Sequence, residues 1–216
     1  MIVNGDVDLI LWGAGGHGLV VLDVARSMSA TSKICFIDDD RRRVGQDLDG
    51  CLVLGDSTIL TTLGNTQFVV SIGQNALRAQ CFERGLAAAL RPVSLTHRSA
   101  MISPSAEIGP GTVVMPGAII NHGAQVGRNC IINSGAIVEH ECVIEDHVHL
   151  SPRAALGGNV KIRQFAHIGI GAVVLPNTEV GMQSTVGAGA VVLHDIGPNL
   201  IVAGVPAKKL SMGSAT

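Results

Sequence analysis

The feature that most constrains the fold is a repeat of six residues in the second half of the sequence. From position 102 to position 192 every sixth residue is aliphatic, and the phase is never broken. The residue two places before each of them is small or β-branched, from Ala100 to Ala190. The aliphatic positions are Ile102, Ile108, Val114, Ile120, Val126, Ile132, Val138, Ile144, Leu150, Leu156, Ile162, Ile168, Val174, Val180, Val186 and Val192.

A period of six matches neither the turn of a helix nor the alternation of a long strand. It indicates a short strand followed by a corner, and three such units make one triangular coil of a parallel β-helix. The run predicts a little over five coils, with the aliphatic side chains pointing inward. Aromatic residues make up only 2% of the chain, which suits such a narrow interior. A β-sandwich of many short strands is the alternative, but its strands would not keep one phase for so long.

The first half of the chain lacks this repeat and shows the pattern of an α/β fold. The run DLILW is expected to form a buried strand, and GAGGHG after it supplies a G-x-G-x-x-G motif at Gly13, Gly15 and Gly18. A helix and a second strand follow, and Asp38 lies 20 residues after Gly18. This order of strand, tight turn, helix, strand and acid is typical of a Rossmann-like nucleotide-binding unit.

We therefore predict two domains, a Rossmann-like α/β domain at 1–95 and an all-β domain of hexapeptide repeats at 96–216. The first domain is too short for the second half of a dinucleotide-binding fold. A single nucleotide, or a sugar linked to one, is expected there rather than a redox cofactor. The alternative that the glycines form only a tight strand–helix turn stays open at this point.

Charge and cysteine content indicate the compartment and exclude some partners. The formal net charge is −2, so we expect no nucleic acid and no anionic membrane as partner. The sequence shows no signal peptide and no apolar run of membrane-spanning length, and its five cysteines lack paired spacing. These features predict a cytoplasmic protein with reduced thiols. Cys130 and Cys142 fall in the small-residue register, where they are expected to pack in corners.

Histidines recur at the spacing of one coil, and one of them has the surroundings of a catalytic base. His122 and His140 are 18 residues apart, as are His149 and His167. His140 lies two residues past an inward aliphatic and should leave the wall of the prism, whereas His147 is expected to be a solvated surface residue. Histidine suits a reaction in which a neutral amine attacks a thioester and a proton is released.

Several runs together resemble one known family, and the resemblance covers nearly the whole chain. The runs are GAGGHG, FIDD, SIG with an asparagine two residues on, INSGAIVEHECVIEDHVHLSP at 132–152, and GVPAK at 204–208. They resemble the bacterial nucleotide-sugar acyltransferases. That family includes enzymes that N-acetylate UDP-linked 4-amino sugars, GDP-perosamine N-acetyltransferases and sialic acid O-acetyltransferases. The run IGQN departs from relatives that carry two asparagines at this point.

The resemblance implies a left-handed β-helix, a homotrimer, and acetyl-CoA as co-substrate in the groove between neighbouring prisms, with no metal. It implies that His140 is the general base, that Glu141 orients it, and that the N–H of Gly158 holds the oxyanion. The implied nucleotide-sugar contacts are Gly13, Gly15, His17, Asp38, Asp39 and Asn133. The implied acetyl-CoA contacts are His149, Ile170, Ala188 and Lys208.

The function that these patterns favour is transfer of acetyl from acetyl-CoA to the amine of a UDP- or GDP-linked 4-amino-deoxy sugar. O-acetylation of a sugar hydroxyl is the main alternative, because it needs the same base. A zinc-dependent hydratase using His122, His140 and His149, and a non-catalytic scaffold, are minor alternatives. The last run, 202–210, is expected to finish the chain as a strand, with Lys208 and Lys209 near CoA phosphates.

Overall fold

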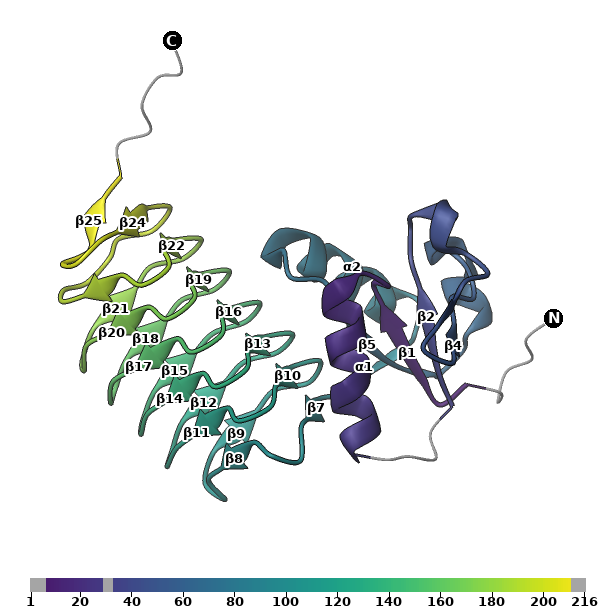
Figure 1. The fold of residues 1–216 in the computed structure, drawn as a ribbon, viewed down its shortest axis with the longest axis horizontal. Coiled ribbons are helices and arrows are strands. Elements are labelled where there is room, and N and C mark those ends of the chain that lie inside the picture. The colour runs from purple at the N-terminus through teal and green to yellow at the C-terminus, as the bar shows by residue number, and fades with distance from the viewer. Residues whose placement is uncertain (1–6, 29–32, 211–216) are drawn as a thin grey trace, which may run out of the picture.

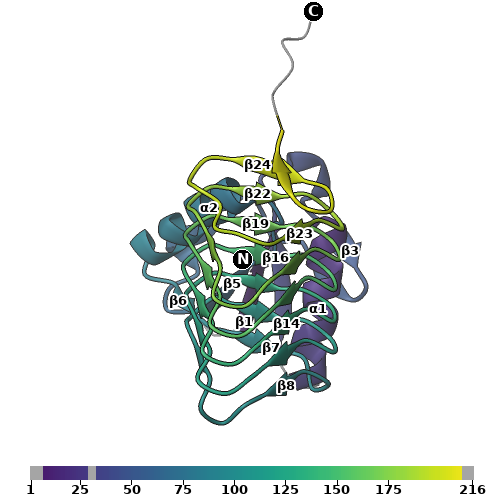
Figure 2. The same ribbon diagram turned by 90° about the vertical axis from the view of Figure 1, so that its left-hand side faces the viewer.

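The protein consists of a small α/β unit and a triangular prism of stacked coils, joined side by side in the computed structural model (Figures 1 and 2). The structure describes residues 7–28 and 33–210. Both α-helices are 13 residues long, and within the described residues no helix has the length and apolar character needed to cross a membrane.

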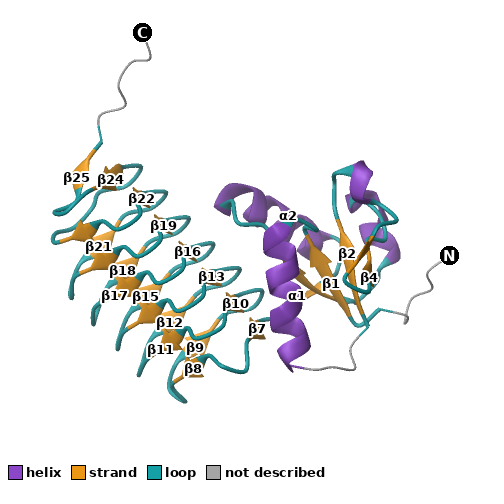
Figure 3. Ribbon diagram, viewed as in Figure 1, coloured by secondary structure: helices purple, strands orange, loops and turns teal. Residues whose placement is uncertain are grey.

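The α/β unit is a four-stranded parallel sheet of order β2-β1-β5-β6 with a helix on each face (Figure 3). Its strands are β1 (Leu9–Trp12), β2 (Ile34–Ile37), β5 (Gln67–Val70) and β6 (Arg91–Pro92), and its helices are α1 (Gly16–Met28) and α2 (Asn75–Ala87). Between β2 and β5 lie η1 (Arg41–Arg43), the hairpin of β3 (Asp47–Leu48) and β4 (Cys51–Leu52), and η2 (Ser57–Thr62).

Alternation along β1 explains why both faces are covered. Leu9 and Leu11 join the cluster under α1, whereas Ile10 and Trp12 join the cluster under α2. The glycine motif then places α1 against β1: a Cβ on Gly18 would lie 2.1 Å from the carbonyl oxygen of Gly13. Only glycine permits this approach of helix to strand, so the motif is a packing device as well as a loop.

The prism is a left-handed parallel β-helix with three faces, each a ladder of two-residue strands that recur every 18 residues as far as residue 192. The first face holds β7 (Leu95–Thr96), β10 (Val113–Val114), β13 (Ile131–Ile132), β16 (His149–Leu150), β19 (His167–Ile168), β22 (Thr185–Val186), β24 (Ile201–Ala203) and β25 (Lys208–Lys209). The second face holds β8 (Met101–Ile102), β11 (Ile119–Ile120), β14 (Ile137–Val138), β17 (Ala155–Leu156), β20 (Val173–Val174) and β23 (Val191–Val192). The third face holds β9 (Glu107–Ile108), β12 (Gln125–Val126), β15 (Val143–Ile144), β18 (Lys161–Ile162) and β21 (Glu179–Val180).

The repeat of six is therefore confirmed as the inward register of the prism. From Val114 to Val192 its members are at most 4% exposed and form one continuous core with the small residues of the corners. Cys130 and Cys142 belong to this core, as predicted. From Gly111 to Gly189 the corners turn through a residue with positive φ, such as Asn129 (54°) and Glu141 (59°). The final run 202–210 is not one strand, because β25 turns back antiparallel to β24.

The two units share a packed interface along the first face. Helix α1 lies between its own sheet and the prism, and Leu95, Val113 and Met115 of the prism belong to the same apolar cluster as the residues of α1. This docking covers the early coils of the first face. It leaves the histidines of β16 and β19 beside the carboxyl ends of the α/β strands.

Candidate active site

A cleft of about 550 Å³ opens at the carboxyl ends of the parallel strands, where α/β folds bind their ligands. Five residues predicted to contact a nucleotide sugar line this cleft together: Gly13, Gly15, His17, Asp38 and Asp39. The sequence motif thus corresponds to a real recess rather than only to a turn.

Asp38 also shapes the loop that forms this cleft. Its Oδ2 accepts a hydrogen bond from the N–H of Ala14 at 2.7 Å, and its Oδ1 accepts one from the N–H of Asp40 at 2.8 Å. Arg43, which sequence reasoning missed, donates to the carbonyl of Ala14 at 2.7 Å. Arg43 brings a cation into a lining that is otherwise acidic, which suits a ligand bearing phosphates.

Asp39 lies on the same wall and is tied to the next loop. Its Oδ1 accepts from the N–H of Ser57 at 2.8 Å, and its Oδ2 lies 3.6 Å from Nη1 of Arg84. Arg84 in turn lies over the ring of Trp12, 5.2 Å from its centroid. The acid is exposed and lines the cleft.

His17 of this cleft, at the start of α1, lies beside two histidines on the first face of the prism, and all three are half-buried. The rings of His17 and His149 lie 6.5 Å apart, and the rings of His149 and His167 stack at 4.9 Å. Asn133, a predicted substrate contact, lies 3.1 Å from Nε2 of His149, and Ser151 contacts Nε2 of His167 at 2.8 Å. The structure thus brings His17, Asn133 and His149 together from three separate elements.

Burial keeps these histidines neutral. Loss of solvation lowers the pKa of His17 to about 4, with a smaller contribution from the charge of Arg78. Burial, helped by His167 and Arg78, lowers the pKa of His149 to about 3. A neutral imidazole accepts at one nitrogen and donates at the other, so this group can position a substrate but is a poor proton acceptor at neutral pH.

A second cleft of about 600 Å³ adjoins the first along the same histidines. His149 and His167 line it from the prism, and Gln74, Asn75 and Ala76 line it from the start of α2. Gly73 lines both clefts. The loop before α2 is therefore the wall that the two recesses share.

His140 occupies a different place, the corner between the second and third faces. Its side chain is 59% exposed, and its Nδ1 lies 3.4 Å from Oε2 of Glu141. The neighbours can meet because Glu141 has a positive φ of 59°. This contact agrees with the predicted role of the acid in orienting the ring.

Gly158 lies directly above His140, one coil further along. A Cβ on Gly158 would come within 2.5 Å of Cε1 and Nε2 of the ring. Five equivalent positions of the repeat hold proline, which has no N–H: Pro104, Pro110, Pro116, Pro152 and Pro176. The hydrogen-bonded ladder therefore does not depend on a backbone donor at this position. Gly158 is buried beneath the imidazole, and none of the hydrogen bonds among the described residues uses its backbone N–H.

The remaining predicted acetyl-CoA contacts lie away from His140. Ile170 and Ala188 stack at the corner between the first and second faces, where the N–H of Gly189 donates to the carbonyl of Ile170 at 2.8 Å. Lys208 is exposed on β25. Asn133 belongs to the same corner as Ile170, and the strand β14 separates this corner from His140. Within one chain His140 is thus separated from the group around His149.

One expectation is wrong. His147 is not a solvated surface residue but is 4% exposed. Its ring stacks on Phe165 at 4.8 Å, and its Nδ1 lies 2.9 Å from Nδ2 of Asn129. The docked α/β unit covers this corner, an effect that the repeat pattern alone does not show.

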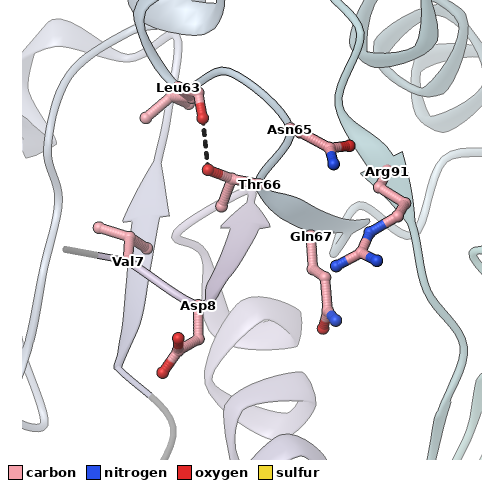
Figure 4. A pocket seen from close by; sticks show the side chains of 7 residues that line it. All are labelled: Val7, Asp8, Leu63, Asn65, Thr66, Gln67 and Arg91. Carbon is pink, nitrogen blue, oxygen red and sulfur yellow. Dashed lines mark hydrogen bonds between the residues drawn. The ribbon is translucent and has the colours of Figure 1, made fainter. Parts of the chain in front are cut away.

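Residues 7–28 and 33–210 contain no group of three or more His, Cys, Asp or Glu placed to hold a metal ion. A polar hollow of about 430 Å³ lies at the opposite edge of the α/β sheet and is lined by Asp8, Asn65, Gln67 and Arg91 among others, whose side chains are drawn in Figure 4. It lies where the parallel strands begin, away from the edge at which such sheets bind ligands.

Comparison with known families matches both units. Residues 8–85 match the model of the PglD N-terminal domain, and residues 105–140 match that of the bacterial transferase hexapeptide (six repeats). UDP-N-acetylbacillosamine N-acetyltransferase of Bacillus subtilis is 38% identical over 105 residues, which are 48% of this chain. The match covers 49% of that protein, so the chain aligns with about half the length of its curated relative.

Solved structures match over almost the full length. PerB from Caulobacter crescentus, in complex with CoA and GDP-perosamine, is 34% identical, and the match covers 94% of this chain and 97% of that one with a TM-score of 0.89. The acetyltransferase domain of PglB from Neisseria gonorrhoeae, in complex with acetyl coenzyme A, is 38% identical, with 95% and 100% covered and a TM-score of 0.91.

Proposed function

The chain belongs to the PglD-like family of nucleotide-sugar acetyltransferases, and on that premise we propose that it transfers acetyl from acetyl-CoA to the amino group of a nucleotide-linked 4-amino-deoxy sugar. The observation that carries the proposal is the cleft that gathers Gly13, Gly15, His17, Asp38 and Asp39, with the ring of His17 lying 6.5 Å from that of His149 on the prism. It supplies a nucleotide site that opens toward the transferase prism.

The proposed mechanism is direct attack by the sugar amine on the thioester. His140 accepts the proton that the amine must lose, and its exposure leaves that proton free to exchange with solvent. Glu141 fixes the ring and favours the imidazolium that forms. The N–H of Gly158 donates to the oxyanion of the tetrahedral intermediate. Collapse of this intermediate breaks the C–S bond, and the CoA thiolate takes up a proton as it leaves.

A covalent acyl-enzyme has no part in this scheme. All five cysteines are free, and four of them are buried. Burial raises the pKa of the Cys130 thiol to about 12, so it is not a thiolate at neutral pH. We place the reaction in the cytoplasm because acetyl-CoA is the co-substrate and the thiols are unpaired.

We propose that the site is completed by a second copy of the chain in a homotrimer. His140 and the group around His149 lie at different corners of one prism, so no single chain assembles them. The outward residues of the second face are all apolar: Met101, Ile119, Ile137, Ala155, Val173 and Val191. Those of the third face are mostly polar: Glu107, Gln125, Val143, Lys161 and Glu179. Burying the apolar face against another copy brings the His140 corner of one chain to the acetyl-CoA corner of the next.

The test is a panel of UDP-, GDP- and dTDP-linked 4-amino-4,6-dideoxy sugars incubated with acetyl-CoA. Release of free thiol and a mass increase of one acetyl group on one nucleotide class is the expected result. The corresponding sugars with a hydroxyl in place of the amine are the matched controls. Acetylation of the hydroxyl sugars alone would show an O-acetyltransferase instead. Absence of thiol release with every sugar of the panel would contradict the proposal.

A further inference from the structure

Arg78 is a buried cation without a counter-ion. It lies on the first turns of α2, and only 1% of its surface is exposed. Among the residues that the structure describes, no carboxylate lies within salt-bridge distance of its guanidinium. A buried charge of this kind is costly unless its donors are all satisfied, so its hydrogen bonds indicate its purpose.

The guanidinium joins the loop before α2 to the prism. Nη1 donates to the carbonyls of Ile72 at 3.2 Å and Gly73 at 3.1 Å. Nε donates to the carbonyl of Asn129 at 2.9 Å, and Nη2 donates to that of His147 at 2.8 Å. The planar fork of arginine reaches both sides at once, which a lysine ammonium on a single stem does not do as well.

Asn75 extends the same connection to a third coil. Its Oδ1 accepts from Nη2 of Arg78 at 2.8 Å, and its Nδ2 donates to the carbonyls of Phe165 at 2.9 Å and Ala166 at 3.1 Å. The amide therefore has a fixed orientation, with its oxygen toward the guanidinium and its nitrogen toward the prism.

The prism supplies these acceptors because its own ladder does not use them. Asn129, His147 and Phe165 are equivalent corner residues on successive coils, with φ of 54°, 62° and 60°. Within the described coils, no backbone N–H of the ladder donates to a carbonyl of this corner position. Arg78 and Asn75 satisfy three of these carbonyls in a row.

The loop held in this way is the wall shared by the two clefts. Ile72 and Gly73 line the nucleotide cleft, and Gly73 and Asn75 line the cleft along His149 and His167. The backbone of Gly73 also acts on His149, where it opposes the lowering of the pKa by burial. A displacement of this loop therefore changes where a bound nucleotide sugar lies relative to the prism.

We propose that Arg78 is a positioning residue that fixes the loop 71–75 against three successive coils, so that the sugar held in the nucleotide cleft meets the acyl group beside His149. This inference rests on the proposed acetyl transfer for its kinetic consequence. Its structural consequence, a loop locked to the prism, is independent of the substrate.

The charge of Arg78 adds a second measurable effect. Burial is the largest cause that lowers the pKa of His17 and of His167, and the charge of Arg78 is the second. The same charge also lowers the pKa of His149. Burial lowers the pKa of Arg78 itself to about 10, so the residue is still a cation at neutral pH. Removing the charge should let these histidines titrate at higher pH, whereas a lysine should keep them low.

The experiment compares Arg78→Lys, Arg78→Met and the control Arg128→Met in the full chain. Arg128 also links α2 to this corner, through Glu83 at 3.4 Å and Asp146 at 3.0 Å, but does not touch the loop 71–75. The readouts are kcat and KM with the amino sugar that the wild-type chain acetylates, calorimetric titration with UDP and with GDP, amide hydrogen exchange of the loop, and histidine NMR titration.

We expect Arg78→Lys to lower kcat by roughly 100-fold, as a misplacement of about 1 Å does. Nucleotide affinity should stay near that of the wild type, and exchange in the loop should become faster. Arg78→Met should do the same and also raise the pKa of His17 and His167. Arg128→Met should leave kcat and loop exchange close to the wild type.

Two results would overturn the proposal. One is a folded Arg78→Lys variant whose kcat and loop exchange match those of Arg128→Met. The other is a parallel loss of kcat, nucleotide affinity and thermal stability in Arg78→Lys, which is the pattern of a purely structural residue. If Arg78→Met does not fold, the kcat, nucleotide affinity and loop exchange of Arg78→Lys decide whether the proposal holds. If the wild-type chain acetylates no sugar of the panel, the proposed function fails, and loop exchange and histidine titration still decide whether Arg78 locks the wall.

Discussion

His140 and His149 lie on the same prism, nine residues apart in the sequence, in opposite surroundings. His140 stands on a corner with more than half of its side chain exposed and a carboxylate beside it. His149 stands on a face that the α/β unit covers, and burial lowers its pKa to about 3. The difference supports the two roles that we propose: the exposed ring is the general base, whereas the half-buried ring stays neutral and orients what it touches.

The first way to break this comparison is to remove the exposed ring. His140→Asn should lower kcat by about 100- to 10,000-fold, the usual range for loss of a general base, because nothing else at the corner takes the proton. Nucleotide-sugar affinity, measured by calorimetry, should be retained. His122→Asn, at the equivalent corner one coil earlier, is the matched control and should keep near-wild-type turnover. Near-normal turnover of His140→Asn would remove this residue from the mechanism.

A smaller change at the same corner should displace the ring without removing it. In Gly158→Ala the new Cβ would lie 2.5 Å from Cε1 and Nε2 of His140, so the imidazole must move. We expect kcat to fall by roughly 100-fold through this misplacement. Gly197→Ala, where a Cβ meets only Leu200 at 3.6 Å, is the control. A crystal structure of Gly158→Ala with the ring unmoved, together with unchanged turnover, would contradict the argument.

The exposed corner was predictable from the sequence and the buried face was not, for a physical reason. The repeat fixes which side chains point inward and which residues stack one coil apart, so the position of His140 under Gly158 follows from counting. The cover over His147 depends on how α1 and α2 dock, and no periodicity encodes that contact. The burial of Arg78 could not be predicted from the sequence either, because an arginine within a helix is usually exposed to solvent.

A third comparison uses the pH dependence of stability. The pKa of His149 lies near 3 in the fold, whereas a histidine in the unfolded chain titrates near 6.5. The unfolded state therefore binds the extra proton as pH falls below about 6.5, and the free energy of unfolding should decrease by about 1.4 kcal/mol per pH unit for this residue until its folded pKa is reached.

Urea unfolding at pH 7, 6 and 5 measures this slope. His149→Gln should reduce the slope of the free energy of unfolding against pH by the contribution of one proton. His194→Gln, at an exposed position of the same prism, is the control for removing a histidine from the surface. An NMR titration in which His149 protonates near pH 6.5 in the folded protein would show that its ring is not held neutral by burial.

The smallest expected effect belongs to the carboxylate beside His140. Glu141 and His140 meet at 3.4 Å with 69% and 59% of their side chains exposed, and solvent screens an ion pair of this kind. Glu141→Gln should therefore lower kcat by about fivefold at most. Glu139→Gln, the carboxylate on the other side of His140, is the control for a general loss of charge. If Glu141→Gln were as damaging as His140→Asn, the corner would be desolvated in the active assembly, and the contrast between an exposed base and a buried histidine group would hold only for the isolated chain.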